Sequence, residues 1–297
     1  MKLARFTQNG RTRIGKVIGD EIIDLSVVIG GNDSMRHLLN HLDSWRGQLE
    51  AITHPAFALS DVTLEAPIAD PQKFLGIGMN YRKHAEEARQ AGIPIPQSQL
   101  WFNKQVSCIN GPFSPVVKPV ATEKMDYEIE LGVVIGTRCR HVKACDAASV
   151  IAGYLIVNDV SARDWLHKSP TFTLGKSFDT HGPIGPWLTT ADEVRDPLDL
   201  QMALSINGER RQSSSTGDMI YDIYQQVEYL STVMTLEPGD ILATGTPSGI
   251  GAPSGQFLQP GDVMRLEISG LGVIENPVIA EHPAATNRPV ARTTEPS

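Results

Sequence analysis

The amino-acid sequence predicts a strand-dominated α+β fold that is divided into two unequal domains. Short stretches with the composition of strands recur along most of the 297 residues, and turns that contain Gly, Asn or Asp separate them. A two-residue Asn207-Gly208 turn follows an alternating apolar run from Leu200 to Ile206, which indicates a β-hairpin. At least part of the predicted sheet is therefore antiparallel, and four helical stretches accompany it.

Residues 1–68 are expected to form a small β-rich domain. The stretches KLARF, RIGKVIG and EIIDLS predict three short strands, because the turns QNG and GD separate them. One helical stretch is predicted around Met35–Ala51. The segment APIADPQK then has the composition of a linker.

Residues 69–282 are expected to form a larger catalytic domain in which strands dominate. The last residues, 283–297, lack periodicity and are rich in Pro, Thr and Ala, so we expect a mobile tail there. The helices predicted in the larger domain cover Tyr81–Ala91, Ala144–Ala152 and Ile220–Met234.

The overall charge and the cysteine content limit the classes of function. A net charge of -8 and a pI near 5.5 argue against general binding to nucleic acid or to anionic membranes. The sequence has no apolar window of about 18 residues and no signal-peptide pattern at its start. Its 3 cysteines do not fit a disulfide framework. We therefore expect a cytoplasmic protein without nucleic-acid or membrane partners.

Two glutamates lie one residue apart in KMDYEIELGVV, which runs from Lys124 to Val134. Because side chains alternate along a strand, Glu128 and Glu130 face the same side. A half-exposed strand with solvated glutamates is the common interpretation of such a pair. The apolar run after Glu130 instead indicates a strand that enters a core, where two carboxylates repel each other unless a cation lies between them. The pair therefore predicts part of a metal site.

A third ligand is predicted in GYLIVNDVSARD, where an apolar strand ends at Asn158 and Asp159. Taken alone, an aspartate at a strand end also suits a helix cap or a turn. Together with Glu128 and Glu130, Asp159 offers three oxygen donors without a nearby His or Cys pair, a set that suits a hard divalent ion. We expect Mg²⁺, with Mn²⁺ and Ca²⁺ as alternatives.

A candidate general base lies in LGIGMNYRKHAEEARQAG. His84 and Glu87 are three residues apart on one face of the predicted helix, where the carboxylate can orient the imidazole and stabilise its charge. A solvated helix with a surface histidine is the alternative interpretation. Lys176, before a Gly- and Pro-rich loop, and Thr246, on a glycine turn, are further polar candidates, although such residues are often structural.

Seven blocks follow one another along the chain: GMNYRKHAEE, FNKQVSCINGP, MDYEIELGVVIG, NDVSARDW, LGKSFDTHGPIGP, INGERRQ and PGDILATGTPSGIG. In this order they resemble the fumarylacetoacetate hydrolase family, in particular the bacterial enzymes of 2-oxo-diacid catabolism and the acylpyruvases. The resemblance implies a mixed β-roll catalytic domain, a small domain before it, and a homodimer. It also assigns the metal ligands to Glu128, Glu130 and Asp159, in agreement with the strand-face argument.

The same resemblance implies roles for five further residues. His84 and Glu87 match the catalytic His-Glu pair of the acylpyruvases, and Lys176 matches an active-site lysine. Arg163 matches a substrate-contacting arginine, and Thr246 a contact to the substrate carboxylate.

Two positions depart from the family's pattern. Family members commonly carry Gln three residues after the arginine, whereas this chain has Leu166, so an amide that could contact the distal carbonyl is absent. His167 is adjacent, but neighbouring positions do not face the same way on regular secondary structure. Asn80 stands where some members place an aspartate near the metal, which implies a less negative site.

Together these features predict a divalent-metal-dependent hydrolase that cleaves the C–C bond of a 2,4-dioxo acid, an acylpyruvate, to pyruvate and a carboxylic acid. His84, assisted by Glu87, would deprotonate the attacking water. Isomerase or hydratase activity on a 2-hydroxyhepta-2,4-dienedioate type of substrate, and decarboxylation of an oxaloacetate type, are alternatives that use the same pyruvoyl head. A non-catalytic 2-oxo-acid or metal binding protein is an alternative of another class, against which the His84-Glu87 pair argues.

Overall fold

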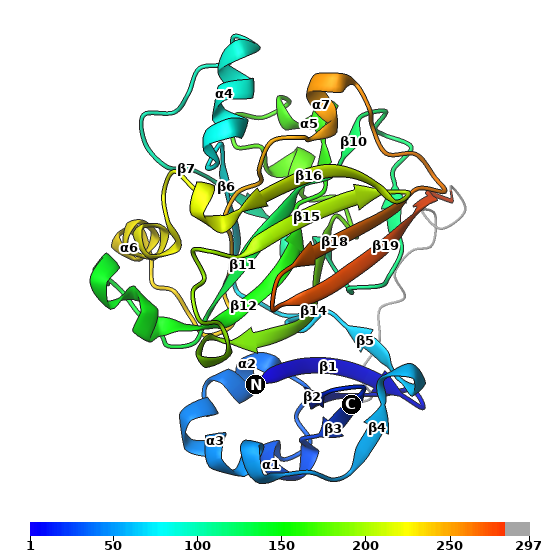
Figure 1. Cartoon of the computed structure of the whole chain (residues 1–297), viewed down its shortest axis with the longest axis vertical. Coiled ribbons are helices and arrows are strands. Elements are labelled where there is room, and N and C mark those ends of the chain that lie inside the picture. The colour runs from blue at the N-terminus through cyan, green and yellow to red at the C-terminus, as the bar shows by residue number, and fades with distance from the viewer. Residues whose placement is uncertain (283–297) are drawn as a thin grey trace, which may run out of the picture.

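The computed structural model describes residues 1–282 and confirms the strand-dominated α+β fold, with one 12-stranded, one 5-stranded and one 2-stranded sheet (Figure 1). Parallel pairs such as β17 with β6 and β19 with β9 occur beside antiparallel ones, so the sheets are mixed. The mobile tail expected for residues 283–297 lies outside the described residues.

The N-terminal part of the chain lies at one end of the large sheet, at the bottom of Figure 1. The helix predicted over Met35–Ala51 is two helices, because the Asn40 side chain donates to the carbonyl of Arg36 at 2.8 Å and α2 ends there. The elements are β1 (Lys2–Gln8), β2 (Arg11–Ile18), β3 (Glu21–Asp24), α1 (Ser26–Ile29), α2 (Met35–Leu39), α3 (Leu42–Ala51), β4 (Ala56–Ala58) and β5 (Thr63–Glu65).

The large sheet continues from this part into the rest of the chain. Its order is β4-β3-β2-β1-β14-β12-β11-β17-β6-β7, with β5 on β1 and β8 on β14. Strand β1 pairs antiparallel with β14, and Lys2 lies opposite Thr189. The domain division at residue 68 stays a prediction, and it falls between β5 and β6. The further strands are β6 (Phe74–Gly78), β7 (Leu100–Lys104), β8 (Ile109–Asn110), β11 (Ile129–Ile135), β12 (Ile151–Asn158), β14 (Gly182–Thr190) and β17 (Ile241–Ala243).

The 5-stranded sheet has the order β16-β15-β18-β19-β9. Its β15-β16 connection confirms the predicted hairpin, since Asn207 and Gly208 both have positive φ angles, 51° and 82°, as a primed turn requires. The 2-stranded sheet pairs β10 with β13. The strands are β9 (Val116–Lys118), β15 (Gln201–Ile206), β16 (Glu209–Ser215), β18 (Val263–Ile268), β19 (Gly272–Ala280), β10 (Met125–Asp126) and β13 (Ser161–Ala162).

Helices α4 and α6 lie at the periphery of the sheets in Figure 1. The helices predicted over Tyr81–Ala91 and Ile220–Met234 are confirmed as α4 (Arg82–Gln90) and α6 (Ile223–Val233). The helix predicted over Ala144–Ala152 is wrong in type and in its end: it is a 3-10 helix, Ala144–Val150, because the β-branched Ile151 already begins β12. The remaining helices are α5 (Arg163–Leu166), α7 (Gly251–Ser254) and 3-10 segments at Leu59–Asp61, Val106–Cys108, Thr173–Lys176, Ala191–Glu193 and Thr216–Asp218.

Strand β11 lies at the centre of the core, and all of its residues are buried. Leu131 and Val133 on one of its faces belong to a single apolar cluster with Leu204 and Leu266 of the 5-stranded sheet. Polar groups at the N-terminal end of β11 therefore lie in surroundings of low dielectric constant. None of the helices within residues 1–282 combines the length and apolarity that a membrane crossing needs.

His181, immediately before β14, should make the protein less stable in acid. Its Nε2 lies 3.0 Å from the carbonyl oxygen of Val117, and burial lowers the pKa of its imidazole to about 3. Below the ordinary histidine pKa of about 6.5, His181 binds a proton in the unfolded chain but not in the folded protein. The free energy of unfolding therefore decreases as the pH is lowered, by up to about 1.4 kcal/mol per pH unit. The free energy of unfolding, measured with urea at pH 7 and at pH 5, should decrease less for His181→Gln than for the parent or for the exposed His282→Gln control. Equal slopes in all three proteins would contradict this.

Candidate functional site

The carboxylates of Glu128, Glu130 and Asp159 come together where β11 begins and β12 ends. The two strands pair antiparallel with Ile129 opposite Asn158, so the residues next to this pair are neighbours. The backbone N–H of Asp159 donates to the carbonyl of Glu128 at 2.9 Å, which fixes the turn that follows β12. One oxygen of each carboxylate lies within 4.8 Å of the others, and all three residues are buried. The structure thus brings together the three residues that the sequence singled out.

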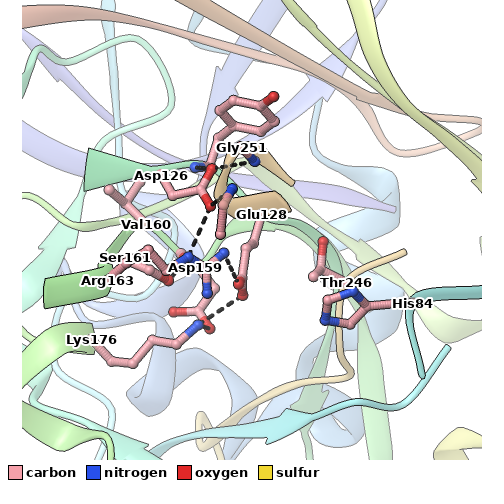
Figure 2. Close-up of polar contacts among 12 residues, drawn as sticks. His84, Asp126, Glu128, Asp159, Val160, Ser161, Arg163, Lys176, Thr246 and Gly251 are labelled. Carbon is pink, nitrogen blue, oxygen red and sulfur yellow. Dashed lines mark hydrogen bonds and ion pairs between the residues drawn. The ribbon is translucent and has the colours of Figure 1, made fainter. Parts of the chain in front are cut away.

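Three cations contact this cluster from other segments of the chain. Lys176 Nζ lies 2.7 Å from Glu128 Oε2 and 2.5 Å from Asp159 Oδ2 (Figure 2). Lys104 Nζ, on β7, lies 2.7 Å from Asp159 Oδ1. The guanidinium of Arg163 forms an ion pair with Glu128, with 2.6 Å between Nη2 and Oε1. Lys176, predicted as a catalytic residue, therefore lies inside the carboxylate cluster.

A fourth carboxylate, Asp126, holds Arg163 in place. It is fully buried, and its Oδ2 accepts from Arg163 Nε at 2.8 Å. The same side chain accepts from the backbone N–H groups of Gly251 and Ala252 at 2.7 and 3.0 Å, at the start of α7 (Figure 2). Two nitrogens of Arg163 are thereby engaged by Asp126 and Glu128, and its predicted contact with substrate stays a prediction.

The surroundings shift the pKa values of the two glutamates in opposite directions. Burial alone would raise the pKa of Glu128, but the charges of Lys176 and Arg163 outweigh it and lower the pKa to about 2. For Glu130, burial and the charges of Asp159 and Glu128 raise the pKa well above its usual value. The backbone N–H of Gly245, 2.8 Å from Oε2, is the donor that Glu130 has in place of an ion pair.

This distribution of charge fits a divalent cation. Within residues 1–282, the three clustered carboxylates and Asp126, which Arg163 links to Glu128, face the three cations Lys104, Lys176 and Arg163, so one negative charge is in excess. The excess falls on Glu130, the carboxylate without an ion pair. Oxygen donors that converge at this spacing are the ligands that Mg²⁺, Mn²⁺ and Ca²⁺ prefer. The cluster could therefore hold a divalent metal ion.

His84 and Glu87 lie together on α4, next to the cluster. His84 Nδ1 is 3.5 Å from Glu87 Oε2, and the side chains are 14% and 36% exposed. Figure 2 shows the His84 ring beside Thr246, with both residues on the side of Glu128 that is opposite to Lys176. The interpretation of α4 as a solvated helix with a surface histidine does not describe this half-buried ring. The Nε2 atom of His84 remains available for a proton transfer, because Nδ1 faces Glu87.

Thr246 lies on the loop that follows β17 and is bonded to the carboxylate-bearing strand. Its hydroxyl donates to the carbonyl of Ile129 at 2.9 Å and accepts from Gln212 Nε2 at 2.9 Å. The preceding Gly245 has a φ of +97°, and a Cβ there would lie 2.7 Å from Asn80 Cβ, so glycine is needed for this turn. The predicted contact of Thr246 with a substrate carboxylate stays a prediction.

The positions that depart from the family's pattern have distinct surroundings. Leu166 is buried on α5, the same short helix as Arg163, and His167 is exposed, with its ring 6.2 Å from that of Phe172. Asn80 is fully buried and donates through Nδ2 to the carbonyls of Thr244 and Tyr221 at 2.7 and 3.0 Å. Asn80 therefore braces the loop after β17.

Sequence reasoning missed three residues of this site. Asp126 carried a usable signal, since it precedes Glu128 by two positions and continues the alternation of acids in KMDYEIE. Lys104 stands in the matching block FNKQVSCINGP, but nothing in the sequence around it reveals that its ammonium is buried at the end of β7. Gln212 likewise lies on a strand of the other sheet, and only the packing of the two sheets shows that it reaches β11.

Comparison with known proteins identifies the family of this chain. The profile of the family described as fumarylacetoacetate (FAA) hydrolase C-terminal matches residues 73–279. A protein of Burkholderia ambifaria, provisionally named a hydrolase, is 42% identical over 279 residues, which cover 92% of this chain and 96% of the relative.

Solved structures are similar over almost the whole chain. Maleylpyruvate hydrolase from Sphingobium sp. SYK-6, in complex with Mn(II) and pyruvate, is 35% identical with a TM-score of 0.82, over 95% of this chain and 100% of that one. A 5-carboxymethyl-2-hydroxymuconate delta-isomerase from Mycobacterium smegmatis is 32% identical with a TM-score of 0.77, again over 95% and 100%.

The fold and the carboxylate cluster define a mixed α+β protein with a candidate divalent-metal centre. The chain belongs to the fumarylacetoacetate hydrolase family. Members of this family are enzymes, and those with similar structures include hydrolases and isomerases.

The raised pKa of Glu130 predicts that metal binding depends on pH and releases a proton. Below that pKa the metal-free protein carries a proton on Glu130 that a cation must displace, so affinity should fall by about ten-fold for each unit that the pH is lowered. Calorimetric titration with Mn²⁺ in buffers of different ionisation enthalpy measures both effects. Binding heats that are the same in every buffer, with an affinity independent of pH, would contradict the assignment.

Proposed function

We propose that this protein is a divalent-metal-dependent hydrolase that cleaves the C–C bond of an acylpyruvate, a 2,4-dioxo acid, to pyruvate and a carboxylic acid. The observation that carries the proposal is a half-buried histidine with a carboxylate partner, His84 and Glu87, beside three buried carboxylates that could hold a metal ion. A base for water and a charged cluster for an anionic substrate are the two parts that hydrolysis of a keto acid needs.

Glu128, Glu130 and Asp159 would hold the ion, with Mg²⁺ as the expected physiological metal and Mn²⁺ or Ca²⁺ as substitutes. When bound, such an ion supplies Lewis-acid stabilisation for the negative charge that develops on the keto acid. The Mn(II) and pyruvate in the related maleylpyruvate hydrolase support a divalent ion as the metal and a keto acid as the substrate class.

The charge balance also supports a keto acid as substrate. The cluster has one excess negative charge, so a divalent ion leaves it with one excess positive charge. A single carboxylate from the substrate then makes the buried site neutral, which is the least costly state in a medium of low dielectric constant. We assign that carboxylate to the side of Lys176 and Thr246, and a second polar group of the substrate to Arg163.

In the proposed reaction His84 accepts a proton from water through Nε2, while Glu87 stabilises the imidazolium from the Nδ1 side. The hydroxide adds to the C4 carbonyl carbon of the substrate. The C3–C4 bond then breaks, its electron pair stays on C3, and C4 leaves as the carboxylic acid. The proton held by His84 passes to C3, so the enolate becomes pyruvate and the histidine is regenerated.

Isomerase activity on a 2-hydroxydienoate diacid is the second candidate. The similarity to the Mycobacterium smegmatis isomerase supports it, because moving a proton along a dienol needs the same pyruvoyl head and the same base. At 35% and 32% identity the Mn(II)- and pyruvate-bound hydrolase and this isomerase are about equally similar to the chain, so a comparison of substrates decides between the two reactions. The homodimer and the cytoplasmic location predicted from the sequence belong to this proposal, as does the 2-oxo acid as the partner molecule.

The proposed activity is tested with a small panel of acylpyruvates and Mg²⁺ or Mn²⁺. Hydrolysis should remove the ultraviolet absorbance of the 2,4-dioxo enol, release pyruvate in equal amount, and stop when EDTA is added. A 2-hydroxydienoate diacid and oxaloacetate serve as comparison substrates. Turnover of these two alone would replace hydrolysis with isomerisation or decarboxylation, and tight oxalate binding without any turnover would indicate a binding protein.

His84→Ala should lower kcat by about 10²- to 10⁴-fold, because it removes the positioned base. Mn²⁺ affinity should stay at the parent value, since His84 contacts Glu87 and none of the three carboxylates in the candidate metal centre. The matched control is Lys83→Ala, an exposed neighbour on the same helix, which should keep parent kcat. Equal turnover by His84→Ala and the parent would remove His84 from the mechanism.

A further inference from the structure

Strand β11 contains Glu130 and begins directly after Glu128. Its pairing with β17 does not extend to Ile129, the residue between the two glutamates. Strand β17 pairs with β11 over Gly132 to Val134, and the N–H of Thr244 still donates to the carbonyl of Leu131 at 3.1 Å. The chain then turns away at Gly245. In a strand the N–H and C=O groups of alternate residues point to the same edge, so the next pair on this edge belongs to Ile129.

Two side chains complete the edge at Ile129. Gln212 Oε1 accepts from the N–H of Ile129 at 3.0 Å, and the Thr246 hydroxyl donates to its carbonyl at 2.9 Å. Gln212 Nε2 also donates to Thr246 Oγ1 and to the carbonyl of Pro247, both at 2.9 Å. The amide of Gln212 thus joins β16 of the 5-stranded sheet to β11 and to the loop after β17.

We propose that Gln212 is a positioning residue of the candidate metal centre. With Thr246 it stands in for the missing neighbouring strand at Ile129, and so fixes the angle between the side chains of Glu128 and Glu130. The inference rests on the proposed function, because it assigns Gln212 a task in holding the metal ligands.

The geometry explains why this brace acts on the carboxylates. Ile129 is the single residue between the two glutamates, so any rotation about its backbone turns one carboxylate relative to the other. Both backbone groups of Ile129 are buried, so without Gln212 the N–H would lack an acceptor. The cost of this unpaired donor would favour such a rotation. Gln212 itself is 1% exposed, and both ends of its amide are bonded, which leaves it one defined orientation.

The test compares two substitutions that remove a buried amide from the same sheet. Gln212→Met keeps the length of the side chain but loses its hydrogen bonds. Asn276→Leu, on β19, similarly removes an amide that donates to the carbonyls of Gly111 and Ser114 at 3.0 and 2.8 Å, away from the carboxylates. Each variant leaves backbone groups unpaired, so both should lower Tm, and the comparison separates positioning from general destabilisation.

In the metal-free protein, amide hydrogen exchange at Ile129 should be faster by about ten-fold or more in Gln212→Met than in Asn276→Leu. The Kd for Mn²⁺ should rise by about 10- to 100-fold in Gln212→Met and stay at the parent value in Asn276→Leu. Exchange at Ile129 that is no faster in Gln212→Met than in the control, or an unchanged Kd, would overturn the inference. Absence of Mn²⁺ binding by the parent would instead refute the proposed function, and the exchange comparison would still decide whether Gln212 braces the strand.

Thr246 provides a second route to the same answer if Gln212→Met does not fold. Thr246→Val removes the hydroxyl that bonds Ile129 and Gln212, whereas Thr246→Ser retains it. Thr246→Val should speed exchange around Ile129 and weaken Mn²⁺ binding, and Thr246→Ser should restore both. Equal Mn²⁺ affinity in the valine and serine variants would overturn the inference.

Discussion

The need to neutralise several buried carboxylates at one point is the constraint on which the rest of the structure depends. Burying a single unpaired charge costs several kcal/mol, so each acid must find a cation or a set of N–H donors. Lys104, Lys176 and Arg163 come from three separate segments, and each is held by ion pairs to the cluster. The same ion pairs that neutralise the cluster therefore fix the loops around it.

The architecture supplies this cluster by ending its strands at different points. Strand β12 ends at Asn158, opposite the first residue of β11, while β17 leaves β11 three residues further along. The carboxylates thus lie at a gap in the pairing of an otherwise continuous sheet. Backbone N–H groups that are no longer used in strand pairing, such as that of Gly245, become donors to the site.

The sequence allowed the fold class, the Asn207-Gly208 hairpin and the three clustered acids to be predicted, because each depends on local periodicity or on a short ordered block. Lys104 and Gln212 could not be predicted, because their contacts join residues distant in sequence. Lys104 reaches Asp159 from another part of the large sheet, and the contact of Gln212 with Ile129 depends on how the two sheets pack. The Met35–Ala51 helix was predicted as one helix because the periodicity of apolar residues gives no sign that the Asn40 side chain bonds the carbonyl of Arg36 and ends α2. Arg163 was predicted as a substrate contact, yet its engagement by Asp126 and Glu128 depends on tertiary structure.

The pairing of β1 with β14 has a consequence for solubility. Strand β14 is covered on one side by β12 and on the other by β1, where Leu3 lies opposite Leu188. Without β1 this part of β14 would be an open edge with unpaired backbone groups, the type of surface through which proteins aggregate or exchange strands. The N-terminal part of the chain thus covers this edge of β14 and shields it from unwanted self-association.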